Sequence, residues 1–299
     1  MIISLAAILF FFNLPSLRWD RNGPINDNKS GYEFTTPDET HVLPDILKEI
    51  SGLTVIDSNT VACVQDENGI LFIYDLSKNA VKQQYVFNGD GDYEGITRVD
   101  KTIYILRSDG TLFEISDYDS KTPKPTSHTA GIPLNNYEGL CYDPDNNRLL
   151  IACKGKIGKG SAFKDRRVIY GFDLKTKTFT QKPVFNIDLK SIKQFAVHAK
   201  INLPTKVKKH GQHTEPIIKF RASAICIHPL EKKLFLLAAS DYLLFIFNKN
   251  GTIEHIEQLD PLLCNKAEGI TFLQNGDLFI SNEGEDKKPT IVRFNYKEK

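Results

Sequence analysis

Five short segments of the chain share a pattern whose second position is Glu or Ser. The glutamates are Glu94, Glu138 and Glu268, and the serines are Ser51 and Ser223. Gly or Ala follows each of them, then Ile or Leu, and successive copies lie 43, 44, 85 and 45 residues apart. A period in the forties predicts structural repeats, and in a closed array the equivalent positions face one axis. We therefore expect three carboxylates and two hydroxyls to converge.

A second set of polar residues lies about fifteen residues after the first, at the ends of apolar runs. Its members carry both signs of charge and are Asp66, Arg107, Lys154, Glu283 and, in the fourth copy, Asp241 or its neighbour Ser240. We expect them to form a second ring beside the first. Both sets together are candidate ligand-binding positions.

Three carboxylates on a narrow axis repel one another, which raises their pKa values unless a cation neutralises them. Ca²⁺ prefers oxygen ligands and is the metal expected among Glu94, Glu138 and Glu268. Alternatively, Arg107 and Lys154 pair with the glutamates, or the glutamates accept hydrogen bonds from backbone amides of the next repeat. General acid–base catalysis is a further use of such groups. The residues alone leave these alternatives open.

The apolar runs between the markers predict many short strands. In the copy that begins at Tyr93, strands are expected at 95–97, 102–106 and 111–115, with a weaker one near 126–128, and Asp109-Gly110 is a hairpin signal. Four antiparallel strands per repeat of this length form one blade of a β-propeller. The last repeat ends after three strands, and the segment 32–43 is free to supply the fourth. We predict an all-β protein, a single β-propeller closed by an N-terminal strand in its last blade.

The 85-residue interval decides the number of blades. The blade that begins at Tyr137 is complete near residue 185, and 186–219 contains no marker. Apolar residues within 188–200 recur at helical spacing. We therefore interpret 186–219 as an insertion and predict five blades, with a degenerate sixth blade as the alternative.

An apolar run at 2–12 opens the chain and suits the core of a signal peptide. We predict a signal peptide or membrane anchor at 1–18, a linker at 19–30 and the propeller domain at 31–299. The protein would then be extracytoplasmic, in the cell envelope, either periplasmic or anchored to the plasma membrane through its N-terminus.

The composition excludes several classes of function. The net charge is +1, so no global basic character points to nucleic acid. The five cysteines have no C-x-x-C spacing, which argues against a zinc motif and a disulfide framework. A monomer is expected, and the sequence does not say whether its partner is a small molecule or a protein.

Several segments resemble the SdiA-regulated family of bacterial envelope β-propellers. They are the five markers together with LIACKG (150–155), SAICIHP (223–229) and DLFISNEG (277–284), and the resemblance covers roughly 33–296. It implies an extracytoplasmic or membrane-associated propeller of a family with no settled activity, some of whose members are linked to calcium responses. The residues that match the recurrent polar positions of the family are Glu94, Glu138, Lys154, Glu268 and Glu283.

Two functions follow as hypotheses. The first is an envelope-associated ligand-binding or protein-interaction module, with calcium in the central channel. The alternative is a calcium-dependent phytase-like or esterase-like hydrolase, in which Ca²⁺ acts as a Lewis acid while Lys154 and Arg107 bind an anionic group. No recognisable nucleophile motif is present, which favours the binding module.

Overall fold

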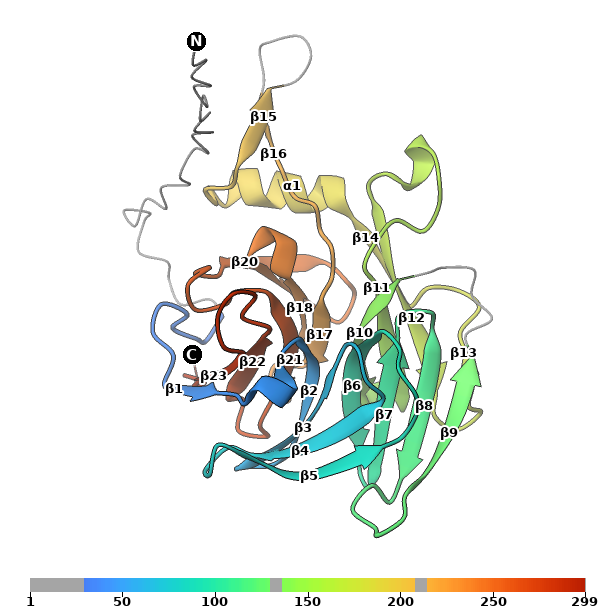
Figure 1. Ribbon diagram of the computed structural model, residues 1–299. Coiled ribbons are helices and arrows are strands. Elements are labelled where there is room, and N and C mark those ends of the chain that lie inside the picture. The colour runs from blue at the N-terminus through green and yellow to red at the C-terminus, as the bar shows by residue number, and fades with distance from the viewer. Residues whose placement is uncertain (1–29, 130–135, 208–213, 299) are drawn as a thin grey trace, which may run out of the picture.

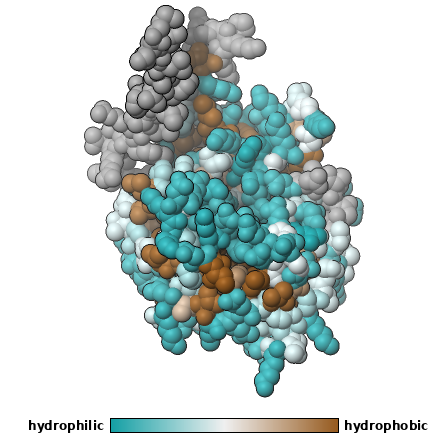
Figure 2. Space-filling model, in the orientation of Figure 1, coloured by the Kyte–Doolittle hydropathy of each residue, from teal (hydrophilic) through white to brown (hydrophobic). Residues whose placement is uncertain are grey.

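The computed structural model describes residues 30–129, 136–207 and 214–298. All but two of their strands form five antiparallel sheets arranged around a common centre (Figure 1). Figure 2 shows that the visible face is mainly hydrophilic, with smaller hydrophobic patches. The predicted segment 1–18 and nearly all of the linker 19–30 lie outside the described residues.

Each blade has its first strand at the centre and its fourth at the rim. The first blade contains β2 (Ile50–Asp57), β3 (Thr60–Gln65), β4 (Ile70–Asp75) and β5 (Ala80–Val86). The second contains β6 (Tyr93–Val99), β7 (Thr102–Arg107), β8 (Thr111–Ser116) and β9 (Lys124–Thr129). The fourth contains β17 (Ala224–Ile227), β18 (Leu234–Ala238), β19 (Leu243–Phe247) and β20 (Ile253–Gln258).

The third blade differs from the expected pattern at its outer edge. It contains β10 (Tyr137–Asp143), β11 (Arg148–Cys153), β12 (Arg166–Asp173), β13 (Thr178–Phe179) and β14 (Phe185–Asp188). Both β13 and β14 pair with β12, so the single fourth strand expected from 178 to 185 is divided in two. Pro183 lies in the gap, where it has no N–H to donate to the sheet.

The fifth blade closes the ring as predicted. It contains β21 (Ala267–Phe272), β22 (Leu278–Asn282), β23 (Thr290–Phe294) and β1 (Glu39–Val42), and β1 pairs antiparallel with β23. The two ends of the described chain therefore share one sheet. Because β1 supplies the fourth strand, the last three-stranded repeat is completed by residues that precede the first marker.

The residues between β14 and β17 do not form a sixth blade. They form α1 (Leu189–His198) and the hairpin of β15 (Thr205–Val207) and β16 (Thr214–Pro216), which stand above the ring in Figure 1. Asp188 caps the helix by accepting a hydrogen bond from the Lys190 amide. Four 3-10 turns complete the described structure: η1 (Asp45–Leu47), η2 (Pro144–Asn146), η3 (Ser161–Phe163) and η4 (Ala239–Asp241).

The hydrophobic core is divided into five clusters, and each lies between two adjacent blades. A blade therefore buries its two faces only against its neighbours, which is why the array must close. The helix α1 adds Leu189, Ile192 and Ala196 to the cluster between the third and fourth blades. Tyr32 and Phe34 fill the cluster between the fourth and fifth.

Candidate functional site

The marker glutamates lie in β-bulges of the innermost strands. In the third blade Tyr137 pairs with Cys153 and Gly139 pairs with Ala152, which leaves Glu138 as the extra residue. The register shifts in the same way across Glu94 in β6 and Glu268 in β21. A bulge bends the strand and redirects one side chain. The repeated bulge therefore gives the three glutamates equivalent positions at one end of the central channel.

The glycine after each glutamate allows neighbouring blades to approach closely. A Cβ atom on Gly95 would lie 2.9 Å from the Glu138 carbonyl oxygen, and one on Gly269 would lie 2.6 Å from the Ser51 carbonyl oxygen. The innermost strands thus touch each other backbone to backbone around the axis. This contact explains why glycine recurs at the third marker position, with Ala224 as the exception.

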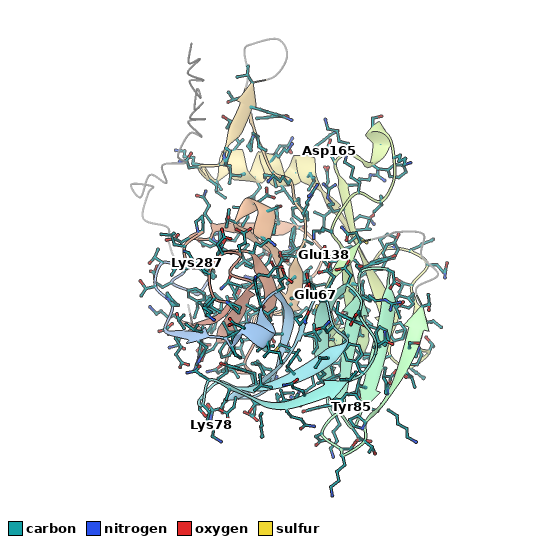
Figure 3. All side chains as sticks on the ribbon, in the orientation of Figure 1. Glu67, Lys78, Tyr85, Glu138, Asp165 and Lys287 are labelled. Atoms are coloured by element: carbon teal, nitrogen blue, oxygen red, sulfur yellow. The ribbon has the colours of Figure 1, made fainter. Side chains whose placement is uncertain are left out.

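Glu138 is the most buried member of the group. Its exposed fraction is 0%, and Figure 3 shows it near the centre of the ring. The Lys154 ammonium, which follows directly after β11, forms an ion pair with Glu138 Oε1. A hydrogen bond with the Glu94 carboxyl group also lowers the pKa of Glu138. Glu138 therefore interacts with both Lys154 and Glu94.

The pKa values of all three glutamates are raised. Burial is the largest cause for each, and it raises the pKa of Glu94 to about 9 and that of Glu268 to about 8, with the Glu138 charge adding to both. Burial also raises the pKa of Glu138 to about 7, against the opposing effect of Lys154. At neutral pH, Glu94 and Glu268 are therefore mainly protonated.

Asp66, from the second set of residues, also has a raised pKa. Burial, followed by the charges of Glu49 and Glu283, raises it to about 6, and Asp66 Oδ1 is buried without a hydrogen bond from the described residues. We call Glu94, Glu138, Glu268 and Lys154 the acidic cluster, because their charges act on one another. It contains three carboxyl groups and one ammonium group.

Two other charged residues of the predicted rings have partners of their own. Arg107 binds Asp109 in the following turn, with 2.8 Å between Nη2 and Oδ2, and its guanidinium lies over the Phe113 ring. Glu283 forms an ion pair of 2.6 Å with Lys266. Of the two cations expected to pair with the marker glutamates, the structure thus places Lys154 in such a pair and Arg107 in a local one.

The remaining predicted residues make structural hydrogen bonds. Ser223 Oγ donates to the Ala267 carbonyl in the next blade at 2.7 Å, and Ser51 Oγ lies 3.5 Å from the Glu49 carbonyl. Both carboxylate oxygens of Asp241 accept backbone N–H groups, from Lys219 and Phe220. We considered hydrogen bonds between neighbouring blades for the marker glutamates, and Ser223 makes such a bond.

Two charged residues near the cluster were not among the predicted site residues. Asp92 raises the pKa of Glu94, and Lys266 lowers that of Glu268. Each lies two positions before a marker glutamate, and this proximity is the signal in the sequence that could have identified them.

The described residues contain no group of three or more His, Cys, Asp or Glu side chains arranged to hold a metal ion. Within the same part of the chain, no helix has the length and apolar content needed to cross a bilayer.

Comparison with known proteins identifies the class of fold. No protein-family model and no curated protein matches the chain. Glutaminyl cyclase from Myxococcus xanthus superimposes with a TM-score of 0.57 at 12% identity, over 88% of this chain and 96% of the cyclase. A streptogramin B lyase gives 0.47 at 14% identity over 86% and 97%, and the WD40 propeller domain of Doa1 gives 0.46 at 11% over 89% and 97%. These likenesses concern the fold alone, and the chain is a five-bladed β-propeller.

Proposed function

We propose that the protein is an envelope-associated binding module whose acidic cluster receives a cation, either an inorganic ion or the charged group of a small molecule or partner protein. The observation that carries this proposal is the gathering of the three marker glutamates around one ammonium: Glu138 is fully buried and paired with Lys154, and Glu94 and Glu268 are mainly protonated at neutral pH. An incoming cation would replace those protons.

Calcium is the inorganic candidate. Glu94, Glu138 and Glu268 would hold the ion through carboxylate oxygens, the ligands that Ca²⁺ prefers. Lys154 would have to leave Glu138 Oε1, and it is able to do so because its side chain is one-third exposed. Bound Ca²⁺ would supply a fixed double positive charge at the channel mouth.

The test measures the metal content of purified full-length protein and its melting temperature in Ca²⁺ and in chelator. We expect Ca²⁺ to raise the melting temperature by several degrees, as binding to the folded state requires. Glu138→Gln should remove the increase. The matched control is Glu298→Gln, which changes an exposed glutamate outside the acidic cluster. If neither metal nor chelator changes the melting temperature, calcium binding is refuted.

The envelope location rests on the apolar run at 2–12 and on the family resemblance. A reporter enzyme that is active only outside the cytoplasm, fused after residue 30, should be active. Inactivity of this fusion, with a known signal peptide as the positive control, would refute export.

The hydrolase alternative also has a supporting observation. Glu94 is a carboxylic acid at neutral pH beside the Glu138–Lys154 pair, which provides a proton donor, an acceptor and an anion-binding ammonium in one place. A panel of phosphate and carboxylic esters tests it. Turnover that requires Ca²⁺ and is lost in Glu138→Gln and Lys154→Ala would establish the hydrolase. No turnover across the panel would leave the binding module.

A further inference from the structure

A cavity lies at the rim of the propeller, where the second and third blades meet. It has a volume of about 310 Å³ and is lined by His128, Thr129, Lys177, Thr178, Phe179 and Gln181. These residues come from β9 and from the turn and strand around β13, which are neighbours at the right-hand edge of Figure 1. Its size is at the lower end of the range for small-molecule sites, roughly 300 to 1,000 Å³.

A carboxylate behind the lining residues binds two of their side chains. Glu114 in β8 accepts a hydrogen bond of 2.6 Å from Lys177 and lies 2.8 Å from His128 Nε2. Lys177 also donates to the Tyr104 hydroxyl at 2.8 Å, and that hydroxyl lies 3.2 Å from Glu114. The cavity is thus built by hydrogen bonds across two blades, and its polar groups are fixed before any ligand arrives.

The same network determines the charge and polarity of the cavity. The ammonium of Lys177 is compensated by the Glu114 carboxylate, so the two together contribute no net charge. When the neutral His128 ring donates from Nε2 to Glu114, its Nδ1 becomes a hydrogen-bond acceptor. The lining therefore presents donors and acceptors without the uncompensated charge that an ionic ligand requires.

The remaining lining combines an aromatic wall with neutral polar groups. Phe179 packs against Phe172 with 4.9 Å between ring centroids and an angle of 66°, which holds its ring in place. Thr129, Thr178 and Gln181 are exposed and offer hydroxyl and amide groups. An apolar surface surrounded by neutral hydrogen-bonding groups suits a ring that carries hydroxyls at its edge and C–H groups on its faces.

We propose that this cavity binds an uncharged, hydroxyl-rich ligand, namely a saccharide unit. The sugar ring packs its C–H face on Phe179, and its hydroxyls bond to His128 Nδ1, the Lys177 ammonium and the Gln181 amide. Hydroxyl groups donate and accept at once, so they satisfy this mixed lining better than a phosphate or a dication does. The site shares no residue with the acidic cluster.

The test titrates full-length protein with methyl glucoside and N-acetylglucosamine, followed by saturation-transfer NMR and calorimetry. We expect millimolar binding that weakens about fivefold or more in Gln181→Ala and in Phe179→Ala, which corresponds to the loss of one good contact. Gln83→Ala changes an exposed glutamine in β5 and should leave binding unchanged. Melting curves establish that each variant is folded, and Gln181 is exposed, so its loss does not affect the core.

Three results would overturn the saccharide site. They are the absence of binding to either sugar at tens of millimolar, equal binding in the wild type and both variants, and displacement of bound sugar by inorganic phosphate. Glu138→Gln should not affect sugar binding, so failure of this proposal and failure of the cation site are distinguishable.

Discussion

The side chain of Glu138 combines complete burial with an ion pair to Lys154 and a hydrogen bond with the Glu94 carboxyl group. Removal of a carboxylate from water is costly unless partners replace the lost hydration. Lys154 replaces only part of it, and the pKa of Glu138 consequently rises to about 7 even with a cation in contact. Among the members of the acidic cluster, Glu138 is the residue that most directly supports the binding of an additional cation.

The raised pKa values predict how stability depends on pH. Their folded values, about 7, 8 and 9, all exceed the usual glutamate value, so between that value and pH 9 the folded state binds more protons than the unfolded state. Stability should therefore fall as pH rises through this window. Urea unfolding at several pH values from 5 to 9 measures it, and a profile that rises over this range would contradict the arrangement.

Glu94→Gln separates this effect from other titrations. The amide keeps the shape of the side chain and cannot ionise, so the variant should be more stable than the wild type by about 2 kcal/mol near pH 8. The pH profile should also become flatter. Glu298→Gln, which changes an exposed glutamate outside the acidic cluster, should change neither the stability nor the profile. Identical pH slopes in the wild type and Glu94→Gln would show that Glu94 is not buried as described.

At the scale of elements, contact between innermost strands determines the blade spacing. Gly95→Ala would place a Cβ atom 2.8 Å from the Leu140 Cβ and 2.9 Å from the Glu138 carbonyl oxygen. We expect a loss of about 2 to 3 kcal/mol in the free energy of unfolding, because two backbones must move apart. Gly89→Ala is the matched control, since its added Cβ would have no described residue within 4 Å apart from its two neighbours in the chain. Equal stability of the two variants would contradict the close approach.

The observed strands and helix show which features of the sequence were sufficient to predict secondary structure. The marker spacing, the apolar runs and the Asp109-Gly110 turn predicted the blade strands because each blade repeats one local pattern. The apolar spacing of 188–200 predicted α1, and Leu189, Ile192 and Ala196 are indeed buried. The hairpin β15–β16 was not predicted, because its two three-residue strands carry no alternating pattern.

At the scale of the molecule, closure depends on four residues near the N-terminus. β1 is hydrogen-bonded to β23, the Asp38 amide donates to the Arg293 carbonyl at 2.9 Å, and Arg293 Nη1 binds Glu39 at 2.7 Å. Removal of residues 1–43 should therefore open the ring and lower the melting temperature by more than ten degrees or abolish folding, by the loss of a whole strand and of Tyr32 and Phe34. The comparison is between the full-length protein and the chain that lacks residues 1–43. Equal melting temperatures would refute closure by β1.

The sequence predicted the whole ring better than its site. The fold could be inferred because the same sequence pattern occurs five times. The interactions of each site residue, in contrast, depend on neighbours that differ from blade to blade. Arg107 and Lys154 occupy equivalent places, and only the acidic residue Asp109 near Arg107 distinguishes their partners. The burial of Glu138 between Glu94 and Lys154 is a property of three-dimensional packing, and no local pattern in the sequence reports it.

The central claim, that the acidic cluster takes up a cation by releasing protons, is tested most directly by calorimetric titration near pH 7.5. Full-length protein is titrated with CaCl₂ and with ethylammonium in two buffers of different ionisation enthalpy. The pKa values of Glu94 and Glu268 predict that binding of one of these cations releases about one to two protons, and that Glu138→Gln weakens it at least tenfold. Absence of binding by both cations, or binding without proton release that is unchanged in Glu138→Gln, would contradict the claim.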